Sequence, residues 1–235
     1  GDFIGSGSIG WNREHVWPKS LGGFKDSGAG ADLHHIRPCD SLTNSRRGNL
    51  KYGNAEGGTD AAGSSLVGGI SGGKYTGGFY EPLDNVKGDV ARICLYVYAR
   101  YGAEYTKCSS ITNVFESVDV LLDWCASDPV DTWEMGRNEV VGKIQGNRNV
   151  FIDYPEYAWL LFGKDIPENM ATPSGFAMSK DDAVSSQDTS VATTRADAPD
   201  TSADTSDNGG CASYVSFALI PSLMICAISF KKKNS

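Results

Sequence analysis

The chain has little histidine, little cysteine and no excess of positive charge. It carries 21 Lys and Arg against 29 Asp and Glu over 235 residues, a formal net charge of −8. This balance excludes a protein that coats nucleic acid by bulk charge, although a local basic cleft or a bound cation could still supply positive charge. Six cysteines are compatible with an exported protein but are too few for a dense disulfide framework. Hydrophobic residues, at 40%, suffice for a packed core, which excludes wholesale disorder.

The sequence changes character at its two ends. No initiator Met or signal peptide precedes Gly1, so we expect a fragment or a processed form. Residues 171–210 are rich in Ser, Thr, Asp and Ala, which predicts a disordered linker. Residues 211–235 are mostly apolar and end in a lysine-rich stretch, which favours a membrane anchor, with a buried or cleaved hydrophobic tail as the alternative. The folded domain is therefore expected over residues 1–170.

The second half of this domain is predicted to be mainly helical. From Asp84 onward, apolar residues recur at spacings typical of a core-facing helix. Its expected buried positions are Val86, Val90, Ile93, Cys94, Val97, Tyr98 and Tyr101. A second helix is expected over residues 114–126, a third from Pro129, and a short last one from Pro155. The buried positions expected for the third helix are Trp133, Val140, Val141 and Ile144. The Gly-rich stretch 57–78 predicts a long loop.

The residues suited to chemistry are concentrated near the start of the chain. All three histidines fall between positions 15 and 35. Two short blocks, 11–18 (WNREHVWP) and 32–38 (DLHHIRP), each end in proline and are joined by a glycine-rich segment. Asp40 follows as a candidate cap for a helix over residues 42–49, on which Asn44 lies. The predicted order is strand, glycine-rich loop, strand and short helix.

These residue types together suit the hydrolysis of a phosphodiester. Carboxylate and carboxamide oxygens are ligands that Mg²⁺ or Ca²⁺ prefers, and a neutral histidine beside such a cation takes a proton from water near neutral pH. Arginines hold phosphate oxygens bidentately. Two other interpretations stay open from the residues alone. One is purely structural histidines, and the other is a zinc site. Its candidate ligands are His15, His34, His35 and Cys39, although adjacent histidines on a strand point to opposite faces.

Three separated blocks resemble the endonuclease I family, a branch of the His-Me finger (ββα-metal) nucleases. They are 13–20 (REHVWPKS), then 32–38 (DLHHIRP) with 44–49 (NSRRGN), and last 137–138 (RN) with 145–156 (QGNRNVFIDYPE). Their shared order makes the resemblance more specific than a single short motif. It implies a ββα-metal core, so we predict an α+β fold with this core and a mainly helical C-terminal half. The linker and the apolar segment that follow are predicted from composition and match nothing in the family pattern.

The resemblance also implies roles for particular residues. His15 is similar to the family's general base, which activates the attacking water, and Glu14 and Asn44 match its two protein ligands of a single divalent cation. We expect Mg²⁺, with Ca²⁺ or Mn²⁺ as alternatives. His34 and His35 are expected to orient the base or a backbone carbonyl. Because Glu14 and His15 are neighbours on a strand, both can serve only if the strand bends or bulges, or if the cation lies at its edge.

Several arginines complete the expected site. Arg37 and Arg47 are assigned to catalysis with the histidine base. The candidates for binding substrate are Arg46, Arg148 and His35.

We therefore predict a metal-dependent endonuclease with little sequence preference that cuts DNA, and possibly RNA, to leave 5′-phosphates. The expected protein is an extracellular monomer, anchored at the cell surface through residues 211–235. The alternative is a non-catalytic, surface-anchored module that binds nucleic acid with the same fold.

Overall fold

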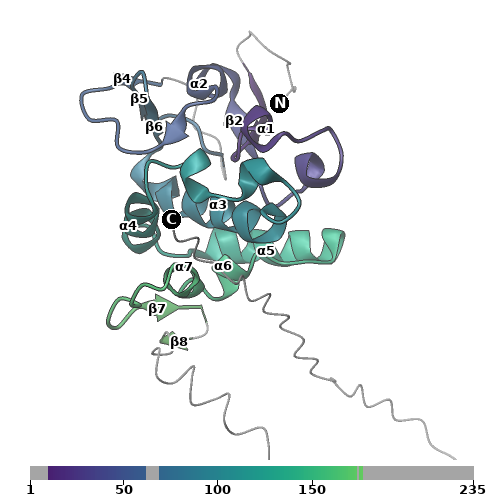
Figure 1. Cartoon of the computed structure of the whole chain (residues 1–235), viewed down its shortest axis with the longest axis vertical. Helices are drawn as coiled ribbons and strands as arrows, with labels where there is room; N and C mark the ends of the chain where they lie inside the picture. Colours follow the sequence, from purple (N-terminus) through teal and green to yellow (C-terminus); the bar gives the residue numbers. More distant parts are fainter. Residues whose placement is uncertain (1–9, 62–68, 174, 177–235) are drawn as a thin grey trace, which may run out of the picture. The chain divides into compact units, whose positions relative to one another are not determined.

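A computed structural model of the chain describes residues 10–61, 69–173 and 175–176 (Figure 1). The predicted apolar segment 211–235 and most of the predicted linker lie outside these residues. No helix within the described part is both long enough and apolar enough to span a bilayer. The described residues form a mixed structure with small sheets and several helices, which agrees with the predicted α+β class.

Two antiparallel strands and a helix form the N-terminal unit. Strand β1 (Trp11–His15) pairs with β2 (Ile36–Asp40) in regular register. Helix α2 (Ser41–Arg47) follows at once, because Asp40 Oδ1 accepts hydrogen bonds from the backbone N–H groups of the helix's first turn. The predicted strand, strand and helix are thus present. The second strand begins four residues later than expected, since residues 32–35 form a turn.

A four-stranded sheet follows, with the strand order β3-β6-β5-β4. Its strands are β3 (Lys51–Tyr52), β4 (Thr59–Asp60), β5 (Lys74–Tyr75) and β6 (Phe79–Glu81). The prediction of one long loop over 57–78 was therefore wrong in part, because β4 and β5 lie within it. Strands of two residues are too short to produce an alternating pattern. Gly73, at φ 90° and with Glu81 O 2.3 Å from where a Cβ would lie, shows why glycine is needed there.

Helix α3 (Lys87–Tyr101) is the centre of the core. Figure 1 shows it between the N-terminal unit and the helices α5 to α7. The predicted stripe is confirmed, since all its members are buried except the half-buried Tyr98. Burial extends beyond that stripe, because α4, α6 and two short 3₁₀ turns pack against α3 from several sides. Even the charged Asp89 and Arg92 are buried, so their charges require partners.

The remaining helices surround α3. They are α4 (Val118–Ser127), α5 (Thr132–Gln145), α6 (Val150–Asp153) and α7 (Tyr157–Leu161). Helices α4 and α5 begin four and three residues later than predicted. The reason is capping: Ser117 Oγ accepts from Val120 N, and Asp131 Oδ1 accepts from Glu134 N.

Two predictions about burial and order are corrected. Val140 and Ile144 of α5 are 55% and 69% exposed, whereas Val141 is buried. The packed side of α5 carries Glu134 and Asn138 beside Val141, so it is largely polar, whereas periodicity favours an apolar one. The predicted linker also begins with structure, because Ala171–Thr172 (β7) pairs with Gly175–Phe176 (β8).

A buried arginine joins three helices. Arg92 Nε and Nη2 of α3 donate to the two carboxylate oxygens of Glu134 in α5, at 3.0 and 2.5 Å, and its Nη1 donates to Asp128 O beyond the end of α4. Arg92 is 1% exposed and Glu134 is 2% exposed. Burial raises the pKa of Glu134 to about 7, and Arg92 opposes that change.

We expect Arg92→Met to lower the free energy of unfolding by about 3–5 kcal/mol, because it leaves the Glu134 carboxylate buried without its cation. Urea unfolding followed by circular dichroism measures the loss. The matched control is Arg100→Met on the same helix, whose exposed guanidinium lies 3.8 Å from Glu104. That variant is expected to change stability by no more than about 0.5 kcal/mol. Equal losses in the two variants would contradict this account.

Candidate active site

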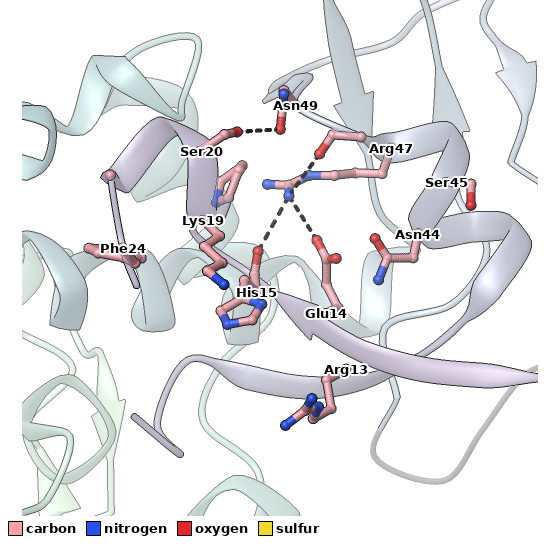
Figure 2. Close-up of a pocket in the computed structure, with 13 residues that line it drawn as sticks. Arg13, Glu14, His15, Lys19, Ser20, Phe24, Asn44, Ser45, Arg47 and Asn49 are labelled. Atoms are coloured by element: carbon pink, nitrogen blue, oxygen red, sulfur yellow. Dashed lines mark hydrogen bonds and ion pairs between the residues drawn. The ribbon is translucent and has the colours of Figure 1, made fainter. Parts of the chain in front are cut away.

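A pocket of about 720 Å³ opens where β1 ends, between α1 (Lys19–Gly22) and α2. Its floor is formed by the last residues of the strand. Figure 2 shows how the side chains from the three elements face this space. The residues that line it are Arg13, Glu14, His15, Pro18, Lys19, Ser20, Gly23, Phe24, Asn44, Ser45, Arg47, Gly48 and Asn49.

The three residues predicted as general base and cation ligands line this one pocket. Glu14 and His15 do so although they are neighbours on a strand. The pairing of β1 with β2 is regular from Trp11 to His15, so no bulge turns the strand. Instead the strand stops at His15, and the pocket lies around its end, where both faces are open to it. Of the geometries considered from the sequence, a bulge within Trp11–His15 is therefore absent, and the position of the cation stays a prediction.

The imidazole of His15 is fixed through one nitrogen. Its Nε2 lies 2.8 Å from Gly30 O. A carbonyl can only accept, so Nε2 carries the proton of the neutral ring and Nδ1 keeps a lone pair. The backbone at Gly30 must be glycine, because a Cβ there would lie 1.8 Å from Lys25 O. The glycine-rich connection thus brings an acceptor to His15 and leaves Nδ1 free to accept a proton.

The carboxylate of Glu14 is held by Arg47. Glu14 is 4% exposed, and its Oε1 accepts from Arg47 Nη1 at 2.8 Å. Burial raises the pKa of Glu14 to about 7, and the positive charge of Arg47 opposes this rise. Its second oxygen, Oε2, makes no hydrogen bond to another described residue.

Asn44 lies beside Glu14 in Figure 2. Its Nδ2 donates to Asn12 Oδ1 at 2.6 Å, so this hydrogen bond uses the amide nitrogen and not the carboxamide oxygen. Within the described residues there is no group of three His, Cys, Asp or Glu side chains that could hold a metal ion. Glu14 and Asn44 offer oxygen donors, and oxygen donors fit a hard cation such as Mg²⁺ better than Zn²⁺.

Arg47 is committed to the protein itself. It is 3% exposed, and besides Glu14 it donates to Val16 O at 2.8 Å and to His15 O at 3.4 Å. Its guanidinium lies over the Tyr52 ring, 4.6 Å from the ring centroid. Arg47 lines the pocket wall, but this geometry makes it a support for Glu14 and for the end of β1 rather than a side chain that grips phosphate.

Arg37 lies outside the pocket. It is 2% exposed, its Nη2 donates to Asp89 Oδ2 at 2.8 Å, and its guanidinium carbon lies 4.3 Å from the Trp133 ring centroid. In this conformation Arg37 joins β2 to α3 and α5 and does not reach the pocket. Nothing in its sequence context distinguishes this buried contact from a catalytic one.

The other two candidate arginines also lie away from the pocket. Arg46 Nη1 donates to Asp60 O at 3.4 Å. Arg148 forms ion pairs with Asp153 and Glu139. Neither side chain lines the pocket.

His34 and His35 hydrogen-bond to backbone carbonyls, as expected. His34 Nε2 lies 2.9 Å from Asn147 O, and His35 Nε2 lies 2.7 Å from Ala29 O. His35 is fully buried and packs edge-on against the His15 ring, with 5.4 Å between centroids. A side chain with no exposed surface cannot contact a substrate from this position, so His35 supports His15 instead. Burial lowers the pKa of His35 to about 4.

Asp32 anchors the segment that carries these histidines. Its Oδ2 accepts from the hydroxyls of Tyr96 and Tyr101 of α3, and its Oδ1 accepts from Gln145 Nε2 of α5. Burial acts to raise the pKa of Asp32, but these hydrogen bonds outweigh burial and hold the pKa below its ordinary value. The third sequence block, which contains Gln145, thus contributes to the site by holding this segment in place.

Several polar residues that line the pocket had no role predicted from the sequence. They are Arg13, Lys19, Ser20 and Asn49. Arg13 could have been found, since a residue two positions before His15 lies on the same strand face. The Ser20 Oγ bond to Asn49 Oδ1, at 2.8 Å, joins α1 to the segment after α2 and depends on tertiary structure.

Fold and pocket define an α+β protein in which an imidazole, a carboxylate and a carboxamide share one cleft. A family model described as Endonuclease I matches residues 1–156. Because this match covers more than half of the chain, the chain belongs to the endonuclease I family, and the resemblance inferred from the three blocks is confirmed.

Individual proteins similar to this chain are also named as nucleases. An extracellular ribonuclease of Bacillus subtilis is 43% identical over 167 residues, which are 66% of this chain and 55% of the relative. An extracellular ribonuclease of Bacillus amyloliquefaciens is 43% identical over 164 residues, 65% of this chain and 54% of the relative. A periplasmic deoxyribonuclease of Aeromonas hydrophila is 28% identical over 139 residues, 56% of this chain and 54% of the relative. The match thus spans about half the length of each of these relatives.

The burial of neutral His35 makes stability depend on pH. Its pKa is about 4 in the folded chain against an ordinary 6.5, so between these values the unfolded chain binds a proton that the folded chain does not. The contribution of neutral His35 to the free energy of unfolding is complete above about pH 6.5. It is lost as the pH falls, by at most about 1.4 kcal/mol per pH unit. We expect His35→Gln, which keeps a donor for Ala29 O but does not titrate, to lose less stability than the wild type on acidification. Urea unfolding between about pH 7 and about pH 4.5 measures the difference. Parallel pH profiles of the two proteins would disprove this role for His35.

Proposed function

We propose that the chain is a metal-dependent nuclease that hydrolyses phosphodiester bonds at the pocket between α1 and α2. The observation that carries this proposal is the convergence of His15, Glu14 and Asn44 on one pocket, with the imidazole fixed through Nε2. The strand–strand–helix unit around the pocket supports a ββα-metal site, in which two strands and a helix carry the base and the ligands. Membership of the endonuclease I family supports the same chemistry.

In the proposed reaction His15 acts as the general base. Its Nδ1 takes a proton from a water molecule, whose oxygen forms a new bond to phosphorus. The bond from phosphorus to the 3′-oxygen breaks, that oxygen receives a proton, and the product keeps a 5′-phosphate. A divalent cation held by Glu14 and Asn44, which we take to be Mg²⁺, would neutralise charge on the scissile phosphate and on the departing oxygen. Arg47 keeps Glu14 in place, and Gly30 and His35 keep the His15 ring in place.

Both DNA and RNA are proposed substrates, with little sequence preference. Relatives at 43% identity are named ribonucleases, and a relative at 28% is named a deoxyribonuclease. The names of these relatives, extracellular and periplasmic, support an extracellular location for this chain. Anchoring through residues 211–235 and a monomeric state stay predictions.

Replacement of the proposed base gives the most direct test. His15→Ala is expected to lower the rate of plasmid and RNA cleavage by about 10²–10⁴-fold, which is the usual contribution of a general base. The control is His34→Gln, which keeps a donor for Asn147 O outside the pocket and should cleave at nearly the wild-type rate. Undiminished cleavage by His15→Ala would remove His15 as the base. Binding of nucleic acid by the wild type without cleavage would support the non-catalytic module instead.

Removal of the cation is the second test. EDTA is expected to stop cleavage, and added Mg²⁺ to restore it. Calorimetric titration with Mn²⁺ should show that Asn44→Ala binds the ion at least about tenfold more weakly than the wild type. Loss of a residue that only supports a metal ligand can already weaken metal binding by this much. This variant leaves the Glu14–Arg47 ion pair intact, and the exposed carboxylate variant Asp119→Asn is the control. Equal Mn²⁺ affinity in all three proteins would show that Asn44 is not a ligand.

A further inference from the structure

Two cationic side chains line the pocket on the side of His15. Arg13 is exposed, lies on the strand face of His15 and makes no side-chain hydrogen bond to another described residue. Lys19 is the first residue of α1, and its side chain is 36% exposed. The proposed catalytic steps use neither of them. Figure 2 shows Lys19 and Asn44 on opposite sides of Glu14, so Lys19 lies apart from Asn44.

A single carboxylate is paired with Lys19. Asp26, in the segment between α1 and the 3₁₀ turn Gly28–Ala31, forms a close ion pair with Lys19 and is 94% exposed. Its pKa is below the ordinary value, mainly because of the hydrogen bond and the charge of Lys19, with smaller contributions from His15 and Arg13. One negative group thus lies in the combined field of three groups that can carry positive charge.

An exposed ion pair of this kind is easily replaced. Such exposed pairs are weak and are screened by salt, so another anion can exchange for the carboxylate. A phosphodiester carries the same single negative charge and accepts the same charge-assisted hydrogen bonds. Asp26 therefore has the charge of a phosphate and the contact with Lys19 that such a phosphate would make, while Arg13 lines the same pocket.

We propose that Arg13 and Lys19 form a second phosphate subsite, which binds a phosphate adjacent to the scissile one, and that Asp26 fills this subsite in the free protein. The inference rests on the proposed function for the identity of the substrate. It predicts that nucleic acid must displace Asp26 from Lys19 before the strand is fully bound. Lys19 and Arg13 then increase the affinity for nucleic acids with more than one phosphate, whereas His15 increases the rate of hydrolysis.

Binding without catalysis gives the first test. The affinity of the full chain for a fluorescent single-stranded oligonucleotide is measured by anisotropy in EDTA at several salt concentrations, and a gel confirms that the probe stays intact. Asp26→Asn is expected to tighten binding by up to about fivefold, the most that an exposed pair withholds. Lys19→Met should weaken binding and reduce the salt slope by about 0.7, the value for one contact to a single strand.

The controls come from a similar pair elsewhere on the surface. Lys164 and Asp119 also form an exposed ion pair, at 3.0 Å, and neither lines the pocket. We expect Asp119→Asn and Lys164→Met to change affinity by less than about twofold, because distant exposed charges are screened. Equal effects of Asp26→Asn and Asp119→Asn would overturn the proposal, since net charge alone would then explain them.

A double variant tests whether Asp26 acts through Lys19. In the Lys19→Met background, Asp26→Asn is expected to lose most of its effect, because the two changes remove the same interaction. A full effect of Asp26→Asn in that background would overturn the subsite. Since these measurements need neither a cation nor cleavage, they decide the subsite even if the nuclease proposal fails.

Kinetics distinguish the second phosphate from the scissile one. With Mg²⁺, Lys19→Met is expected to raise KM for a substrate with two phosphates and to change kcat by less than about twofold, the pattern of lost uniform binding. A dinucleotide with a single phosphate should be cleaved equally well by the variant and the wild type. A large fall in kcat, or an equal effect on the single-phosphate substrate, would show that Lys19 acts on the scissile phosphate and would overturn the proposal.

Discussion

The buried ion pair between Glu14 and Arg47 is the interaction on which the pocket depends. Two charges taken out of water are tolerated only when their remaining donors and acceptors are satisfied. Arg47 meets most of this requirement by also donating to the carbonyls at the end of β1 and by lying over Tyr52. The pair therefore joins the last residue pair of the strand to the last turn of α2. As a result, a carboxylate and the Asn44 carboxamide share one wall, while His15 lies beside them at the strand's end.

A second set of contacts reaches the proposed base from the helical half of the chain. Tyr96 and Tyr101 of α3 bind Asp32, which holds the turn before β2 against the core. The neighbouring 3₁₀ turn then presents Gly30 O to the His15 ring. The helical half thus helps to orient the His15 imidazole, through tyrosines that lie more than 80 positions away in the sequence. This also explains why only one of the three histidines has a nitrogen available in the pocket.

The sequence predicted the elements whose patterns are long or whose ends carry clear capping residues. Helix α3 and the Asp40 cap of α2 are examples. The sequence did not predict the two-residue strands β4 and β5, because two residues are too few to show an alternating pattern. It also failed for Val140 and Ile144, because the buried face of α5 carries Glu134 and Asn138 beside Val141, and these two polar residues are bound by Arg92 and Asn149. Periodicity assumes an apolar core, and a helix packed through ion pairs and amides does not meet that assumption.

Residue types and their order by themselves determined the family of this protein, and they predicted three side chains that line one pocket at the end of β1. Only the tertiary structure decided which arginines lie in the pocket. Arg37, Arg46, Arg47 and Arg148 have the same side chain, yet Arg37 and Arg47 are buried in ion pairs, whereas Arg46 and Arg148 do not line the pocket. The cations that do face the pocket beside His15 are Arg13 and Lys19. The physical reason is that a guanidinium takes whichever carboxylate or carbonyl the fold brings near, and such partners are distant in the sequence.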